Sequence, residues 1–177
     1  MIKISHWRRK LIQKKERAAI PIMTQPGIQM IHKTVKDAVM RGEIHFQAVK
    51  ALADQFSTAA STMMMDLSVE AEAFGADVRF TDHDIPAVHG RLLDSAAEIR
   101  KLAIPELSVG RLPQYLLASE LAVKGITDRP VFASCIGPFS LAGRLFGISE
   151  IMLELFSDPE TVHRLLEKCT DFLLTYI

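Results

Sequence analysis

Three short apolar runs constrain the fold of this chain more than any other feature. They read AIPIM (19–23), STMMMD (61–66) and PVFASC (130–135), and helical segments separate them. Short apolar runs bounded by turn residues are typical of buried strands. Helical connections favour parallel pairing, because parallel strands need long crossover connections. The sequence therefore predicts an α/β fold with about three strands.

The remaining elements follow from apolar spacing and from helix start signals. Helices are expected over about 4–17, 34–40, 44–59, 94–102, 113–124, after Gly137 and from 157 to the end. Ser157 and Glu160 fit a capping box at the start of the last helix. ADVRFTDHD (76–84) and IPAVHGRLL (85–93) alternate with a period near two, so they predict a β-hairpin insertion.

Length and charge exclude several function classes. The chain has 177 residues and a formal net charge of +0. We therefore expect one domain and no nucleic-acid partner. No apolar run reaches the length of a membrane span, so we expect no membrane partner. Residues 1–18 predict a basic N-terminal helix, with Trp7 and Leu11 inward and a solvated basic face.

The two cysteines carry little information about function. Cys135 and Cys169 form neither a disulfide framework nor a CxxC pair. This pattern suits a reducing compartment and a cytoplasmic location. We interpret Cys135 as a buried core thiol.

Asp66 ends the second apolar run, and Glu70 and Glu72 follow it closely. In parallel α/β folds the carboxyl ends of strands carry the chemistry, so Asp66 is a candidate to accept hydrogen bonds from a ligand. The alternative is that Asp66 caps the turn that follows. Residues two apart on a helix diverge, so we expect at least one of the two glutamates to be solvated.

The turn at Gly137-Pro138 also has two interpretations. Glycine gives the backbone freedom to turn, and proline suits the first helical turn. The free N–H groups of such a turn can hold an anion. The alternative is a tight connection from strand to helix without a ligand.

Several blocks together resemble the uroporphyrinogen decarboxylase superfamily. They are SVEAEAFGADVRF (68–80) behind Asp66, CIGPFSLAGRLFG (135–147) and SDPETVHRLLEK (157–168). The resemblance covers about residues 15–177. It implies that residues 19–177 are the N-terminal half of a TIM-type (β/α)8 barrel, so we expect an incomplete barrel.

Two departures separate the branches of this superfamily. Decarboxylases of the family carry an M-R-Q-A-G-R-Y block, whereas this chain reads MTQPGIQ (23–29), with Thr24 and Ile28 in place of both arginines. Arg144 replaces a tyrosine of the family. The chain therefore looks more like the corrinoid-linked and zinc-dependent methyltransferases. The resemblance implies a catalytic Asp66 and substrate-binding Thr24, Gln25, Gly27, Glu70, Gly137, Phe139, Ser140 and Arg144.

The resemblance also implies cofactors and partners for the complete enzyme. Methyltransferases of this kind hold zinc through a His-x-Cys pair and a later cysteine, and none of the six histidines here has a cysteine two positions on. We therefore expect no metal or other cofactor in this chain alone, and zinc and methylcobalamin in the complete enzyme. The expected partners are a corrinoid protein or a tetrapyrrole-like molecule, and the missing C-terminal half or a second copy.

Three functions remain open on the sequence. The first is part of a methyltransferase that moves a methyl group between a corrinoid and a thiol such as coenzyme M, inactive as this chain alone. The second is a tetrapyrrole decarboxylase. The third is a non-catalytic half-barrel that binds or assembles with a partner.

Overall fold

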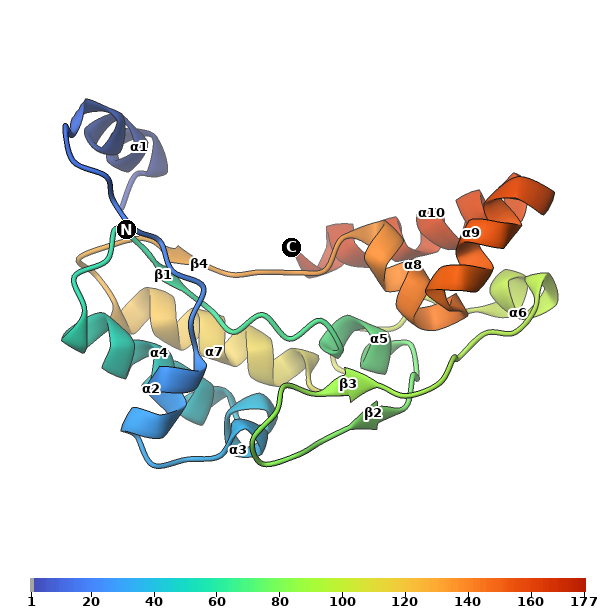
Figure 1. Cartoon of the computed structure of the whole chain (residues 1–177), viewed down its shortest axis with the longest axis horizontal. Helices are drawn as coiled ribbons and strands as arrows, with labels where there is room; N and C mark the ends of the chain where they lie inside the picture. Colours follow the sequence, from blue (N-terminus) through green and yellow to red (C-terminus); the bar gives the residue numbers. More distant parts are fainter. Residues whose placement is uncertain (1) are drawn as a thin grey trace. The chain divides into compact units, whose positions relative to one another are not determined.

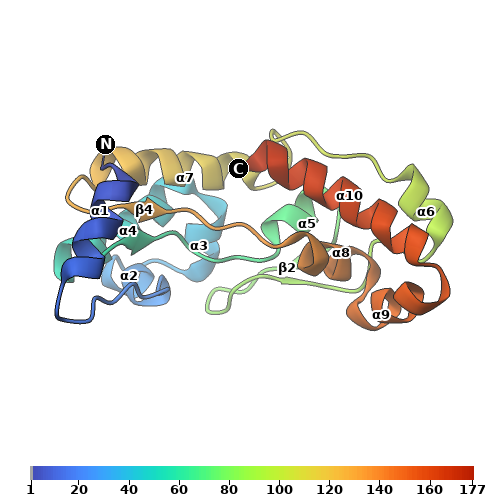
Figure 2. The same ribbon diagram turned by 90° about the horizontal axis from the view of Figure 1, so that it is seen from above.

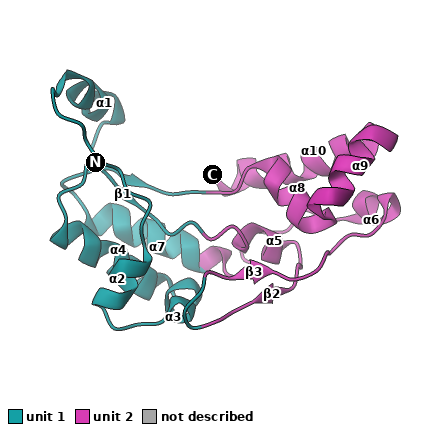
Figure 3. Ribbon diagram, in the orientation of Figure 1, with its two compact units in different colours: residues 1–65, 82–84, 114–134 teal, residues 66–81, 85–113, 135–177 magenta. Residues whose placement is uncertain are grey.

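The computed structural model describes residues 2–177 and divides the chain into two compact units (Figure 3). Unit 1 comprises Met1–Met65, Asp82–Asp84 and Gln114–Ser134. Unit 2 comprises Asp66–Thr81, Ile85–Pro113 and Cys135–Ile177. Each unit therefore gathers segments that are far apart in the sequence.

Unit 1 contains the parallel pair that the apolar runs predict. Strand β1 (Ser61–Thr62) pairs with β4 (Val131–Phe132), with Ser61 opposite Val131 and Thr62 opposite Phe132 (Figure 1). Parallel pairing is confirmed, but each run forms only two residues of strand. Met63, directly after β1, still donates its N–H to the Phe132 carbonyl of β4, and Met65 is exposed.

The prediction of a buried strand over 19–23 is wrong. These residues form no strand, and Ile20 and Ile22 are 39% and 65% exposed. The segment still runs beside β1, because Ala59 N–H donates to the Ala19 carbonyl and the Thr62 hydroxyl donates to the Pro21 carbonyl. Pro21 has no N–H group, so it cannot donate to a regular ladder.

Unit 1 contains helices and a core of mostly small and branched side chains. The helices are α1 (Ile4–Gln13), α2 (Gln25–Met30), α3 (Val35–Met40), α4 (Gly42–Gln55) and α7 (Leu112–Gly125). The core cluster contains Val49, Ala53, Met63, Ala118, Ala122 and Ile126. Thr34 caps α3 in a reciprocal capping box with Asp37, which confirms the predicted start of this helix.

Helix α1 is shorter than predicted. Its basic side chains are exposed and Trp7 and Leu11 are partly buried, as the sequence indicates. It ends at Gln13, and Arg8, Arg9 and Lys10 are exposed. The Trp7 indole N–H donates to the Ala59 carbonyl at 2.9 Å, and its ring meets Phe132 edge-on at 5.5 Å. Trp7 thus anchors α1 against the strands of unit 1.

Unit 2 is a cluster of helices with one small hairpin. Its elements are α5 (Val69–Ala73), β2 (Val78–Arg79), β3 (Ala87–Val88), α6 (Ala96–Lys101), α8 (Pro138–Phe146), α9 (Ile148–Ser157) and α10 (Pro159–Tyr176). Strands β2 and β3 pair antiparallel, which confirms the predicted hairpin. Helix α10 packs along α6, α8 and α9 (Figure 2). None of the helices formed by residues 2–177 is long and apolar enough to cross a membrane.

The start of α10 differs from the predicted capping box. The N-cap is Asp158 rather than Ser157, and its carboxylate accepts a hydrogen bond from the Thr161 N–H. Ser157 is instead the last residue of α9. The buried face of α10 is as predicted for Val162, Leu165, Cys169, Phe172 and Leu173, whereas Leu166 is only half-buried.

Gly27 shows how closely α2 approaches α4. It is buried in α2, and a Cβ atom at this position would lie 2.3 Å from the Ala48 carbonyl oxygen of α4 and 2.8 Å from Leu52. A backbone oxygen inside a helix cannot move aside easily. Gly27 is therefore needed for helix packing, whatever role it has toward a ligand.

We predict that Gly27→Ala lowers the free energy of unfolding by about 1–3 kcal/mol, because the added methyl overpacks the contact between α2 and α4. Gly143→Ala in α8 is the matched control. Its Cβ would meet the tip of Ile148, a flexible side chain that can shift. Urea denaturation of both variants measures the difference, and equal losses would contradict this account of Gly27.

Candidate functional site

A buried arginine organises the region around the predicted catalytic residue. Arg111 is 3% exposed, and its Nη1 lies 2.5 Å from Oδ2 of Asp66. Its Nε lies 2.5 Å from Oε2 of Glu72, and its Nη2 donates to the Ser68 hydroxyl at 2.9 Å. The Phe80 ring lies 4.9 Å from the guanidinium carbon. One side chain thus joins two carboxylates and a hydroxyl within unit 2.

Asp66 is engaged through both carboxylate oxygens. While Oδ2 pairs with Arg111, Oδ1 accepts hydrogen bonds from the Ser68 N–H at 2.9 Å and from the Ser68 hydroxyl at 2.6 Å. These two bonds to Ser68 form a turn just before α5. The N-cap of α5 is Ser68, and no side chain caps this helix, so the prediction that Asp66 caps it is wrong. A catalytic role for Asp66 stays a prediction, and the structure adds a structural role to it.

Glu70 and Glu72 point to different partners, and neither is simply solvated, so that prediction is wrong. Glu72 pairs with Arg111. Glu70 is 2% exposed, and its Oε1 accepts a hydrogen bond from the Ile136 N–H at 2.9 Å. Its Oε2 is buried and has no hydrogen-bond partner among the described residues. Burial raises the pKa of Glu70, against the opposing effect of the Ile136 hydrogen bond.

Cys135 is exposed, so the prediction of a buried core thiol is wrong for this residue. Its pKa is raised by partial desolvation and by the charge of Glu70. Cys169, in contrast, is fully buried in α10, and burial raises the pKa of its thiol to about 12. Cys135 is displaced from the core because β4 ends at Phe132, three residues before it.

A groove in unit 2 brings together two of the predicted binding residues. It has a volume of about 480 Å³ and is lined by Leu67, Val88, Gly90, Ser140, Gly143, Arg144, Gly147 and Ile148. Ser140 and Arg144 lie one turn apart on α8, so both face the groove. Gly137 is the N-cap of α8, and Gly137 and Phe139 are exposed nearby in the chain.

The other predicted binding residues lie in unit 1. Thr24 is buried as the N-cap of α2, and Gln25 donates from Nε2 to the His83 carbonyl at 3.3 Å. Gln25 also lines a cavity of about 190 Å³ with Lys33 and Asp82 among its neighbours. The predicted site residues thus form two sets, one in each unit.

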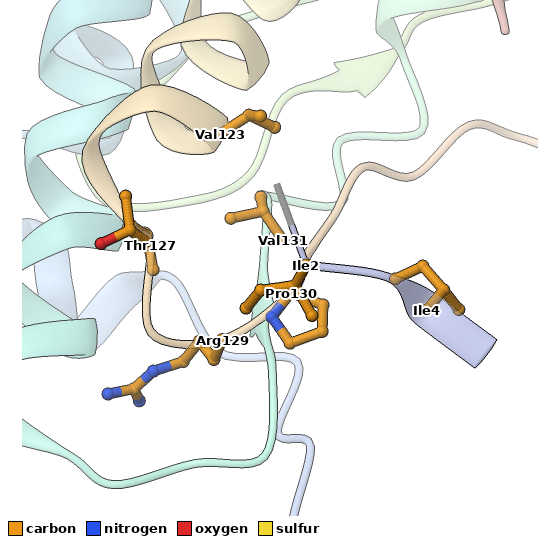
Figure 4. Close-up of a pocket in the computed structure, with 8 residues that line it drawn as sticks. Ile2, Ile4, Val123, Thr127, Arg129, Pro130 and Val131 are labelled. Atoms are coloured by element: carbon orange, nitrogen blue, oxygen red, sulfur yellow. The ribbon is translucent and has the colours of Figure 1, made fainter. Parts of the chain in front are cut away.

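Unit 1 has a further pocket, beside the start of the chain (Figure 4). Its volume is about 240 Å³, and its walls are mostly apolar, including Ile2, Ile4 and Val131. The guanidinium of Arg129 extends away from Ile4 and binds Asp128 and the Phe56 carbonyl (Figure 4). The pocket lacks the converging polar groups of a binding site, so we interpret it as a gap beneath the N-terminal segment.

The side chains of residues 2–177 do not form a metal site. No three histidine, cysteine, aspartate or glutamate side chains among them are placed to hold one ion. The zinc that the resemblance implies therefore does not fit the residues present. No step involving zinc is assigned to them.

The sequence analysis does not predict a role for Arg111. It lies 45 residues from Asp66, and no periodic pattern or motif connects the two positions. The only available signal was a single arginine after Gly110 at the start of an expected helix.

Comparisons with known proteins give the family of this chain and relatives with two kinds of activity. A family model described as "Uroporphyrinogen decarboxylase (URO-D)" matches residues 16–177. Methylcobamide:CoM methyltransferase MtbA of Methanosarcina acetivorans is 34% identical over 113 residues, which cover 63% of this chain and 33% of the relative. Uroporphyrinogen decarboxylase of Vibrio campbellii is 24% identical over 149 residues, which cover 80% of this chain and 40% of the relative.

A solved structure of a methyltransferase from Methanosarcina mazei has the same fold. The TM-score is 0.79 at 20% identity, over 90% of this chain and 47% of the other. The fold is that of the first part of a TIM-type barrel, as predicted. The chain spans about a third of the length of the methyltransferase relative that it matches.

We predict that Arg111→Met lowers the free energy of unfolding by about 3–5 kcal/mol, because it leaves the buried Asp66 carboxylate without its guanidinium. Arg91→Met is the matched control. Arg91 is 41% exposed and pairs with Glu150 and Asp94, so its loss should cost at most about 1 kcal/mol. Guanidinium denaturation measures both, and a loss at position 111 no larger than at position 91 would refute the central role of Arg111.

The pH dependence of stability tests the environment of Glu70. A carboxyl with a raised folded-state pKa binds a proton more tightly when folded, so its contribution to stability falls as pH rises from about 4.5 through the folded value. Glu70→Gln removes this dependence. Relative to wild type, the variant should become progressively more stable from pH 4 to pH 8.

Glu120→Gln provides the control of opposite sign. The hydrogen bond and charge of Lys124 lower the pKa of Glu120, so this variant should lose stability relative to wild type as pH rises toward about 4.5 and keep a constant difference at higher pH. The measurement is the unfolding midpoint in urea at several pH values. If the difference in stability between Glu70→Gln and wild type does not change with pH, Glu70 is hydrated in solution and this account is wrong.

Proposed function

The chain belongs to the uroporphyrinogen decarboxylase family, and on this premise we propose that it forms part of a methyltransferase. The proposed reaction moves a methyl group between a corrinoid and a thiol such as coenzyme M. Sequence identity supports a methyltransferase over a decarboxylase. The methyltransferase of Methanosarcina acetivorans is 34% identical to this chain, and the decarboxylase of Vibrio campbellii is 24% identical.

The single structural observation that supports the proposal is the environment of residues 24–28. At the two positions where family decarboxylases carry arginines, Thr24 is 9% exposed and Ile28 is 2% exposed. Ile28 is packed into the interior of unit 1 as part of α2, which contacts α4. No guanidinium occupies these positions to pair with the carboxylates of a tetrapyrrole.

Within the proposed enzyme, the residues of unit 2 position and bind. Arg111 holds Asp66, Ser68 and Glu72, so the segment that leads into α5 is fixed. Glu70 keeps one buried oxygen available for a hydrogen bond to a ligand. A corrinoid would supply the methyl carrier when bound. Ser140 and Arg144 would hold the acceptor in their groove.

The remainder of the barrel is also part of the proposal. Relatives are two to three times as long as the matched segment. We propose that the complete site forms when this chain associates with the remaining barrel, as further polypeptide or as a second copy. The corrinoid is then presented by a partner protein.

A methyl-transfer assay tests the proposed function. The chain is purified under native conditions with its associated proteins, and the solution mass is measured by light scattering against 19.7 kDa for one chain. Methylcobalamin and coenzyme M are then added with zinc, and the loss of the cobalt–methyl bond is followed by absorbance. We expect methyl transfer by a species heavier than one chain, and none in zinc-containing buffer alone.

Two other results would overturn the proposal. Release of carbon dioxide from uroporphyrinogen without methyl transfer would identify a decarboxylase. A stable heavier species that performs neither reaction would identify a non-catalytic module that binds or assembles with its partner.

A further inference from the structure

Helix α9 presents an apolar surface that residues 2–177 leave exposed. Of its ten residues, only Ile151 is fully buried. Met152, Leu153 and Phe156 are exposed, Leu153 by 72% and Phe156 by 96%, and they lie within about 100° of one another around the helix axis. We call these three residues the α9 face. A helix that is apolar around most of its circumference is normally buried, so this face is a candidate interaction surface.

Acidic side chains surround the α9 face. Glu150 and Glu154 lie on α9 itself, and Asp158 and Glu160 lie at the junction with α10. Arg91 pairs with Glu150, whereas the other three make no ion pair with a basic residue among residues 2–177. A partner that fits this face therefore combines exposed apolar side chains with basic ones.

Helix α1 has this combination. Residues 3–17 contain seven lysines and arginines and one acid, Glu16. None of the seven has an ion-pair partner among residues 2–177. Ile4 and Ile12 are also exposed, and no residue of α1 is buried. Figure 1 shows α1 standing apart from the other helices of unit 1, so its outer surface is accessible.

The charges of the whole chain divide in the same way between the two units. Unit 1 has 13 lysines and arginines and 8 aspartates and glutamates, whereas unit 2 has 8 and 13. The formal net charge of +0 therefore combines +5 on unit 1 with −5 on unit 2. Unit 1 of one copy thus attracts unit 2 of another copy, and such complementary charges steer association and fix its register.

We propose that α1 of one copy of this chain docks on the α9 face of a second copy. Ile4 and Ile12 pack against the α9 face, while the exposed Arg8, Arg9 and Lys10 meet the carboxylates around it. The contact joins two different surfaces, so it is heterologous. This association does not depend on the proposed function, because it requires neither a corrinoid nor a thiol.

Other occupants use only one of the two surfaces. Nucleic acid would bind the basic residues of α1 and leave the α9 face, with its carboxylates, exposed. An anionic membrane would attract α1 and repel the same carboxylates. A second copy carries both a basic helix with exposed apolar residues and an apolar face with an acidic margin, so it satisfies both surfaces at once.

Sedimentation velocity of the purified 177-residue chain tests the proposal. The measurement covers a range of protein concentrations and is compared with 19.7 kDa for one chain. We expect the mass to rise above one chain as the concentration increases. The dissociation constant should rise at least about tenfold between about 50 mM and about 500 mM sodium chloride, because salt screens exposed charges.

Substitutions on α9 test the apolar part of the contact. Leu153→Ser combined with Phe156→Ser should weaken self-association by about tenfold or more, because it removes the two most exposed apolar side chains of α9. Leu174→Ser is the matched control. Leu174 is also 72% exposed but lies on α10, so its replacement should leave the dissociation constant unchanged.

Substitutions on α1 test the charged part. Arg8→Glu combined with Arg9→Glu should also weaken self-association by about tenfold or more, because it places like charges against the carboxylates around the α9 face. Arg100→Glu combined with Lys101→Glu is the matched control. It reverses two adjacent exposed charges on α6, and self-association should persist.

Mixing the two weakened variants shows whether α1 and α9 meet between copies. The Arg8/Arg9 variant keeps its α9 face, and the Leu153/Phe156 variant keeps its α1 helix. A fluorescent label on one variant should therefore reveal a heavier species in the mixture that neither variant forms alone.

The outcomes separate this inference from the proposed function. A mass of one chain at every concentration overturns the inference, even if that chain binds nucleic acid or anionic vesicles. Equal losses in variants and controls, or a mixture that associates no better than its components, also overturn it. Self-association that depends on α1 and α9, together with no methyl transfer, retains the inference and overturns the proposed function. Methyl transfer by a complex with other proteins, when the purified chain stays single, does the reverse.

Discussion

The buried guanidinium of Arg111 is the interaction on which the structure of unit 2 depends. It connects Asp66 and Ser68, just before α5, with Glu72 inside that helix. A charge that is 3% exposed is tolerated only when its donors are satisfied, and here two carboxylates and a hydroxyl accept from it. The ion pairs and the hydrogen bond of Arg111, rather than the hydrogen bonds of a sheet, therefore hold the segment between β1 and α5.

This arrangement explains how one short helix serves two purposes. Glu72 faces Arg111, while Glu70 faces the Ile136 N–H on the segment that leads to α8. The two residues diverge, as helix geometry requires, but both directions are occupied by protein. Helix α5 thus joins the Arg111 network to α8, whose outer face carries Ser140 and Arg144. The site residues of unit 2 are linked through contacts that no single motif contains.

Local patterns in the sequence predicted much of the secondary structure. The capping box of Thr34, the hairpin at 76–93 and the buried face of α10 are confirmed, because each depends on neighbouring residues and short spacing. Three predictions failed where distant contacts decided the outcome. The segment 19–23 lies beside β1 with Ile20 and Ile22 exposed, and Cys135 lies outside the core. Neither Glu70 nor Glu72 is simply solvated, because Ile136 and Arg111 pair with them.

The sequence by itself determined the fold class, the parallel pairing of the apolar runs, the family and the identity of the residues at each motif position. Tertiary structure decided what those residues do. Asp66 is held by Arg111, which lies 45 residues away, and Arg144 lines a groove of unit 2 together with residues from distant segments such as Leu67 and Val88. Spacing along the chain encodes contacts over one or two helical turns, whereas the partners of a buried charge depend on which distant segments pack together.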